Sequence, residues 1–182
     1  MFSEDMTEHE PDHLDHIVEQ WQRERPEVDV TALAVMGRLF RVAEFAHIEL
    51  GRGLKGYELP PGWFDVLAAL RRAGSPFELT PTALMHAMML SSGGVTKRLD
   101  RLVEARLVRR RPDPADRRGI LVRLTPRGRR LIDQALVEHV ANEEALLEAL
   151  TLAERRQLDD VLRRLLSGLE SDALARGARR GV

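Results

Sequence analysis

Cysteine is absent from this 182-residue sequence, and aromatic residues make up only 4% of it. The lack of thiols excludes disulfides, thiolate metal sites and cysteine-based redox sensing. No apolar run approaches the roughly 18 residues that a membrane-spanning helix requires. The N-terminal stretch MFSEDMTEHEPDHLDH is polar and acidic, unlike a secretory signal. We therefore expect a cytoplasmic protein that does not associate with membranes and has a mainly aliphatic core.

The sequence motifs that accompany common catalytic chemistries are also missing. No glycine-rich phosphate loop follows a predicted strand, and there is no nucleophile elbow. His9, His13 and His16 recur at helical spacing, but they lie near a terminus and the sequence specifies no fourth ligand. We therefore predict neither an enzyme nor a metal or cofactor site.

Basic residues are concentrated in one segment of a chain whose formal net charge is only −1. Residues 91–130 hold 13 Lys and Arg but only four Asp and Glu, so the rest of the chain is acidic. This asymmetry indicates a localised anion-binding face. The alternative is a solvated surface that reflects a general preference for arginine over lysine. Binding is favoured because the surplus is confined to elements that could dock on a ligand.

Hydrophobic periodicity predicts helices over most of the chain. Thr80, followed by Pro81, has the character of a helix N-cap, as does Thr125, followed by Pro126. The expected helices cover about 12–25, 31–50, 62–73, 80–89, 92–105, 126–149 and 152–169, with a loose tail after them. The period changes to two in LVRRR and RGILVRLT, and the intervening PDPAD is typical of a turn, which predicts a β-hairpin.

Three helices followed by a basic two-stranded hairpin are typical of a winged helix-turn-helix. We therefore predict a mainly α (α+β) fold in which residues 92–105 form the recognition helix and the hairpin forms the wing. Residues 62–125 would be the DNA-binding region. The helix from Thr31 has an apolar surface too broad for one neighbouring layer to cover, so we expect it to pack against a partner.

Double-stranded DNA explains why one hairpin carries so many arginines. Lys and Arg gain affinity by displacing the counterions condensed on phosphates, and arginine suits a narrow minor groove. The candidate DNA-binding residues are Ser91, Ser92, Gly93, Thr96, Lys97, Arg98, Arg101, Arg117 and Arg118. We also expect Asp116 to pair with one of the wing-tip arginines. The alternative function is a winged-helix module that contacts an acidic protein surface.

The stretch SSGGVTKRLDRLVEARLVRRRPDPADRRGILVRLTPRGRRL resembles the recognition helix and wing of the MarR family of bacterial transcriptional regulators. The resemblance extends over about residues 30–170, and helix, wing tip and following helix match in order. It implies a homodimer in which the N-terminal helices, within residues 1–61, and the C-terminal helices, within residues 126–182, form the interface. It also implies that the dimer represses by binding a palindromic operator and is released by a small ligand. Two recognition helices would then lie about one helical turn of DNA, ~34 Å, apart.

Four residues suggest a separate ligand site. Trp21 lies on the apolar face of the N-terminal helix, and Asp65 interrupts an otherwise apolar helix. Arg72 is two turns after Asp65, and Arg110 shares its strand face with Val108. A ring, a carboxylate and two guanidinium groups suit a flat anion. The structural alternative is that Asp65 and Arg72 form an ordinary ion pair and that Trp21 is a core residue.

The stretches WQRERPEVD, WFDVLAALRRAG and LVRRRPDPADRR are similar to the urate-responsive subgroup of the MarR family, the HucR-like and PecS-like proteins. That resemblance implies ligand-binding roles for Trp21, Asp65, Arg72 and Arg110. It also implies that Arg98, in the recognition helix, relays the signal. The expected ligand is a small anion such as urate, and another planar phenolic or carboxylate effector is the alternative.

Overall fold

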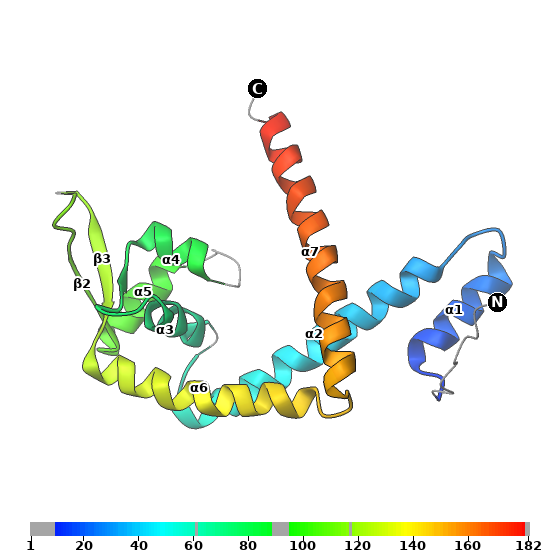
Figure 1. The fold of residues 1–182 in the computed structure, drawn as a ribbon, viewed down its shortest axis with the longest axis horizontal. Coiled ribbons are helices and arrows are strands. Elements are labelled where there is room, and N and C mark those ends of the chain that lie inside the picture. The colour runs from blue at the N-terminus through cyan, green and yellow to red at the C-terminus, as the bar shows by residue number, and fades with distance from the viewer. Residues whose placement is uncertain (1–9, 61, 89–94, 117, 181–182) are drawn as a thin grey trace. The chain divides into compact units, whose positions relative to one another are not determined.

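The computed structural model describes residues 10–60, 62–88, 95–116 and 118–180 (Figure 1). The chain divides into two units, residues 1–52 and residues 53–182, and each unit is described by itself. Helices dominate the described residues, and the strands form a small antiparallel sheet. The predicted mainly α fold class is therefore confirmed.

The first unit consists of helix α1 (His13–Glu24) and almost all of helix α2 (Thr31–Gly53). Helix α2 begins at the predicted residue, Thr31, and α1 begins one residue after the predicted Asp12, which is its N-cap. The side chain of Asp29 accepts a hydrogen bond of 2.9 Å from the Thr31 amide at the start of α2. No residue of α2 is buried, so its broad apolar surface is uncovered.

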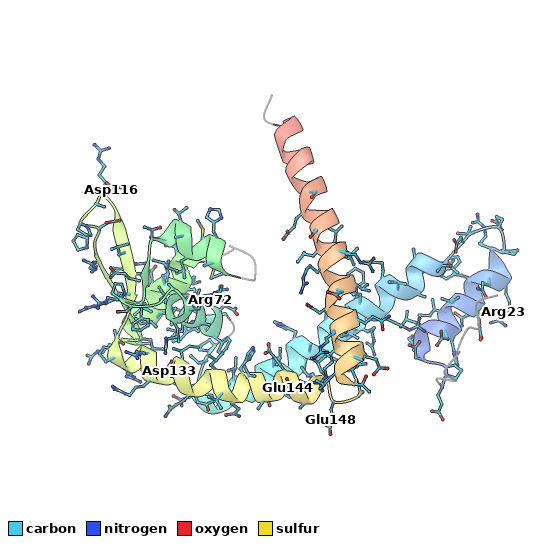
Figure 2. The ribbon with its side chains drawn as sticks, in the orientation of Figure 1. Arg23, Arg72, Asp116, Asp133, Glu144 and Glu148 are labelled. Atoms are coloured by element: carbon cyan, nitrogen blue, oxygen red, sulfur yellow. The ribbon has the colours of Figure 1, made fainter. Side chains whose placement is uncertain are left out.

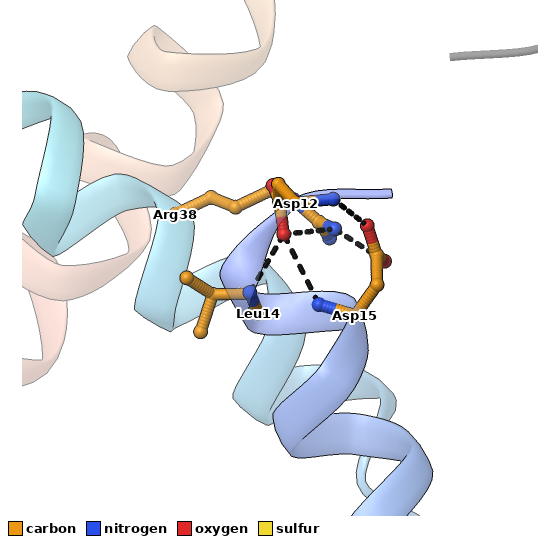
Figure 3. Close-up of polar contacts among 4 residues, drawn as sticks. All are labelled: Asp12, Leu14, Asp15 and Arg38. Atoms are coloured by element: carbon orange, nitrogen blue, oxygen red, sulfur yellow. Dashed lines mark hydrogen bonds and ion pairs between the residues drawn. The ribbon is translucent and has the colours of Figure 1, made fainter. Parts of the chain in front are cut away.

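A capping box fixes the start of α1 (Figure 3). The Asp12 carboxylate accepts hydrogen bonds from the amides of Leu14 and Asp15, at 2.7 and 3.1 Å, and the Asp15 carboxylate accepts one from the Asp12 amide at 2.8 Å. Arg38, on α2, donates from Nε to Asp12 at 2.8 Å and also bonds Asp15. The hydrogen bond from Arg38 lowers the pKa of Asp12 to about 2.

The second unit contains, in chain order, the 3-10 helix η1 (Leu54–Tyr57), α3 (Trp63–Arg72), β1 (Glu78–Leu79), α4 (Pro81–Ala87), α5 (Val95–Glu104), β2 (Val108–Pro112), β3 (Ile120–Leu124), α6 (Pro126–Leu146) and α7 (Leu152–Arg180). The sheet order is β1-β3-β2, with both pairings antiparallel. The hairpin β2–β3 is the predicted wing, seen projecting at the left of Figure 1. Strand β1 was not predicted.

Aliphatic side chains from α3, α4, α5, the wing and α6 form the core of the second unit. Its largest fully buried side chains are Val66, Leu67, Leu70, Leu84, Leu102, Val108, Val122 and Ile132. Burial of a side chain of this size contributes about 1.5–3 kcal/mol. The core therefore fixes the recognition helix and the wing base on a common support.

The junction between the wing and α6 is held by Thr125. Its side chain caps α6 by accepting a hydrogen bond from the Gly128 amide at 3.0 Å. The same hydroxyl lies 2.8 Å from the carbonyl oxygen of Arg106 and 3.1 Å from that of Leu107. A Cβ at Gly128 would overlap the Leu107 carbonyl group. Only glycine allows this close approach of α6 to the start of β2.

Helix α7 is longer than the sequence analysis predicts. The expected end near Leu169, with a loose tail, is wrong, because the helix continues to Arg180. The added segment is rich in Ala and Arg, which favour helix, and these outweigh the cost of Gly177. Within the described part of the chain, no helix is both long and apolar enough to cross a membrane.

Candidate nucleic-acid interface

Helix α5 presents a polar face opposite its core contacts. Leu99 and Leu102 are buried, whereas Thr96, Lys97 and Arg101 are exposed. These three predicted DNA-binding side chains are therefore accessible to a polyanion. The predicted contacts that precede them lie outside the described residues, namely Ser91, Ser92 and Gly93.

Arg98 differs from its neighbours on α5 because it is only partly exposed. Its guanidinium group lies against the backbone of Gly62, where a Cβ would come within 2.7 Å of both Nε and Nη2. Gly62 is the N-cap of α3 and has a φ of 79°, in the left-handed region. The recognition helix and the first turn of α3, which contains Asp65, are thus in direct contact through Arg98.

Backbone hydrogen bonds and two carboxylates, those of Asp113 and Asp116, shape the wing tip. Asp113 donates from its amide to the Gly119 carbonyl at 3.0 Å, and Gly119 donates to the Asp116 carbonyl at 2.8 Å. Arg118 is exposed, and Arg117 lies outside the described residues. Asp116, labelled at the tip in Figure 2, accepts from the Arg118 amide at 2.9 Å. It caps the turn and, among the described residues, does not form the expected ion pair with an arginine side chain.

One face of the wing is joined to the recognition helix. Arg110 shares the side of β2 that carries the buried Val108, as its parity predicts, and is paired in register with Val122. Its Nη1 lies 2.7 Å from Oδ1 of Asp100 on α5. This ion pair was not predicted. The sequence offered one indication of this pair, because Asp100 is an isolated carboxylate among several basic residues.

The opposite face of the wing sheet carries Arg109, Arg111 and Arg123. Arg111 binds Glu78 of β1 bidentately, at 2.9 Å from Nε and 2.6 Å from Nη2. Arg123 lies 4.0 Å from the same carboxylate. The hydrogen bond from Arg111 holds the pKa of Glu78 below its ordinary value. Glu78 thus fastens β1 to both wing strands.

The predicted ligand residues occur in both units. Trp21 is on α1, and 46% of its surface is exposed. Asp65, on α3, is partly exposed and has no hydrogen-bond or ion-pair partner among the described residues. Arg72 does not pair with Asp65. Its side chain, labelled on α3 in Figure 2, donates instead to the carbonyl oxygen of Ala87 at the end of α4.

The described geometry defines the class of protein. Three helices are followed by a hairpin, and exposed cations concentrate on that hairpin and on the outer face of α5. This arrangement is a winged helix-turn-helix of the kind that places one helix in the major groove of DNA. A family model described as the MarR family matches residues 57–119.

Sequence comparison supports a more specific assignment. The chain is 38% identical over 149 residues to the HTH-type transcriptional regulator PecS of Dickeya dadantii, an alignment that covers 82% of this chain and 90% of PecS. This chain belongs to the MarR family and is a DNA-binding transcriptional regulator.

Solved structures give the same fold. A variant of Escherichia coli MarR complexed with operator DNA is 30% identical to this chain, with a TM-score of 0.66, and the match covers 76% of this chain and 99% of that one. BpsR of Bordetella bronchiseptica, whose DNA binding is regulated by 6-hydroxynicotinic acid, is 27% identical with a TM-score of 0.65, covering 72% and 91% of the two chains.

Proposed function

We propose that this chain is a homodimeric repressor that binds a palindromic operator and is released by a small planar anion, with urate as the first candidate. The observation that carries the proposal is the contact between Arg98 and Gly62. This contact joins α5, the proposed recognition helix, to the first turn of α3, which contains Asp65. A change at the ligand site therefore has a direct physical route to the DNA-binding surface.

Exposed apolar side chains support the homodimer. On α2, Phe40 is 65% exposed and Val42 is 67% exposed, although a single chain gains nothing from leaving them in water. Helix α7 likewise exposes Leu152, Leu166 and Leu169. Large apolar side chains left in water on both helices are typical of an interface, so we assign residues 1–61 and 126–182 to dimerisation and residues 62–125 to DNA binding.

The exposed cations support binding to a duplex. Lys97 and Arg101 lie on the accessible face of α5, and Arg118 lies beside the wing tip. In a twofold dimer, the two α5 helices would enter successive major grooves about 34 Å apart, which matches a palindrome. Operator DNA bound to a relative of the same fold favours this partner over an acidic protein surface.

The contacts of Arg72 and Arg110 suggest how a ligand would act. Arg110 uses Nη1 for Asp100, and Arg72 uses Nη2 for Ala87. Each guanidinium group has five N–H donors, so each retains donors for an anion. An anion bound there would compete with Asp100 for Arg110 and would repel Asp65. Both effects act on α5, directly at Asp100 and, through Gly62, at Arg98.

A different aromatic carboxylate is the second candidate effector. The DNA binding of BpsR, a relative of the same fold, is regulated by 6-hydroxynicotinic acid. That compound shares a flat ring and an anionic oxygen group with urate, and Arg72 and Arg110 could bind either one. The half-exposed ring of Trp21 is accessible to a planar compound of either kind.

Titration of protein–DNA complexes tests the proposal. The duplex would cover the region upstream of the chain's own gene, and anisotropy would report its release by urate or by 6-hydroxynicotinic acid. We expect Asp65→Asn and Arg110→Ala to retain binding of the duplex in the absence of ligand and to require about tenfold more ligand for release.

Arg156→Gln is the matched control, because Arg156 is exposed on α7 and lies outside the proposed site. It should respond to ligand as the unmodified protein does. Release that is unchanged in Asp65→Asn and Arg110→Ala would remove these residues from the ligand site. The whole proposal would be overturned if the chain were monomeric in solution and did not bind the duplex at low salt.

A further inference from the structure

A second basic site lies at the base of the wing, apart from the residues assigned to the urate-type ligand. A cavity of about 480 Å³ opens between the outer face of the wing sheet and the first turns of α6. Its charged lining consists of Arg109, Arg123, Arg129, Arg130 and Asp133. Four cations therefore face a single carboxylate.

The carboxylates near this cavity already form hydrogen bonds or ion pairs with arginine side chains. Asp133 accepts a hydrogen bond of 2.6 Å from Arg71 and lies 3.7 Å from Arg129. Glu78 is bound bidentately by Arg111. Within the described part of the chain, the side chains of Arg109 and Arg130 form neither a hydrogen bond nor an ion pair. The cavity thus keeps an excess of positive charge.

The strand register places two of these positive charges next to each other. Arg109 and Arg123 are directly opposite each other in the β2–β3 pair. Like charges in this arrangement destabilise a sheet. Glu78 offsets part of this repulsion, because its carboxylate lies 4.0 Å from Arg123 and its pKa is also lowered by Arg109. A further anion in the cavity would offset the rest. The cavity is also far larger than a single chloride needs and falls within the usual size range of small-molecule sites.

We propose that this cavity binds a small phosphate-bearing molecule through Arg109, Arg123 and Arg130. Phosphate oxygens match the forked donors of guanidinium groups, and a group with two negative charges suits an excess of cations. The inference goes beyond the proposed function, because it concerns different residues and a different ligand class.

Small molecules are favoured over the DNA backbone by the position of the cavity. Arg110, whose parity is opposite to that of Arg109 and Arg111, is the β2 residue that contacts α5. Arg109 and Arg123 lie on the other face of the sheet, with Glu78 of β1. A duplex that receives α5 in its groove would therefore approach the opposite side of the wing.

Inorganic pyrophosphate is the probe for the test. Its binding to the full chain would be measured by calorimetry, without DNA or urate, at an ionic strength held constant with sodium chloride. We expect Arg109→Gln and Arg130→Gln each to weaken binding about tenfold. Both side chains are exposed and make no ion pair among the described residues, so the variants should fold normally.

Arg127→Gln removes the same charge from the first turn of α6, but Arg127 does not line the cavity. It should bind pyrophosphate as the unmodified chain does. Absence of binding by the unmodified chain, or equal weakening by all three variants, would overturn the proposal. So would a loss of duplex binding in Arg109→Gln and Arg130→Gln as large as their loss of pyrophosphate binding, since the cavity would then serve DNA.

Discussion

The guanidinium group of Arg98 lies where a side chain at Gly62 would have to be. A Cβ at position 62 would come within 2.7 Å of Nε and Nη2 of Arg98, and the backbone there has a φ of 79°. Glycine is required at this position both for its conformation and for the space it leaves. The position of the Arg98 guanidinium group therefore depends on a residue that precedes α3.

Gly62→Ala tests this dependence. The positive φ and the overlap with Arg98 should together lower the free energy of unfolding by about 2 kcal/mol. Affinity for the duplex should also fall, because the Arg98 guanidinium group must leave its position against α3 to make room. Chemical denaturation and anisotropy would measure the two effects.

Gly56→Ala is the control for this prediction, because a Cβ at Gly56 meets nothing within 4 Å. It should leave both stability and DNA affinity nearly unchanged. If Gly62→Ala behaves like Gly56→Ala, the contact between Arg98 and Gly62 does not position the recognition helix.

The ion pair between Arg110 and Asp100 should contribute little to stability. The two side chains are 37% and 49% exposed, and solvent screens charges at such exposure. A double-mutant cycle with Arg110→Gln and Asp100→Asn should give a coupling energy below about 1 kcal/mol in unfolding experiments. A coupling several times larger would show that the pair is part of the folded core.

Glu78 should make stability depend on pH in the acid range. Arg111 lowers the pKa of Glu78 below its ordinary value of 4.5, so the ionised form is the one that the fold stabilises. This contribution is present above that value and is lost as the pH falls through the lowered pKa. Glu78→Gln should therefore be less stable than the unmodified chain at neutral pH.

The stability difference caused by Glu78→Gln should shrink as the pH falls below about 4.5. Urea denaturation at a series of pH values would measure it. Asp116→Asn, at the exposed wing tip, is a suitable comparison because Asp116 accepts a backbone hydrogen bond and, in the described structure, has no ion-pair partner. A difference for Glu78→Gln that stays constant down to pH 3 would contradict the assigned role of Arg111.

Salt dependence should reveal phosphate contacts at the wing tip. If Arg118 neutralises one phosphate, Arg118→Gln should reduce the slope of log affinity against log salt by about 1 per chain. Anisotropy titrations across a range of sodium chloride concentrations would give the slope. Arg156→Gln should leave it unchanged, and equal slopes for Arg118→Gln and the unmodified chain would exclude the contact.

The elements that could be predicted from sequence are those with local signals. Thr80 and Thr125 cap α4 and α6 as expected, because a hydroxyl followed by proline is a local pattern. The wing was predicted from its change of period. Strand β1 was missed because its two residues are held by pairing with β3, more than 40 residues later.

In the candidate site too, features with a local sequence pattern could be predicted and tertiary contacts could not. The exposure of Lys97 and Arg101 follows from the helical period of α5, which buries Leu99 and Leu102. The contact of Arg98 with Gly62 could not be predicted, because it depends on how α5 packs against the start of α3. The bond from Arg72 to Ala87 is likewise a tertiary contact.

Thr125 has a consequence for how motion is passed along the chain. Its hydroxyl and amide hold the chain between α5 and β2, through Arg106 and Leu107, while its side chain also caps α6. Hydrogen bonds of this one residue thus connect the end of β3, the chain between α5 and β2, and the start of α6. If the hairpin tilts when the chain binds DNA, these hydrogen bonds require the first turn of α6 to move with it. A single threonine therefore couples the wing to the helix.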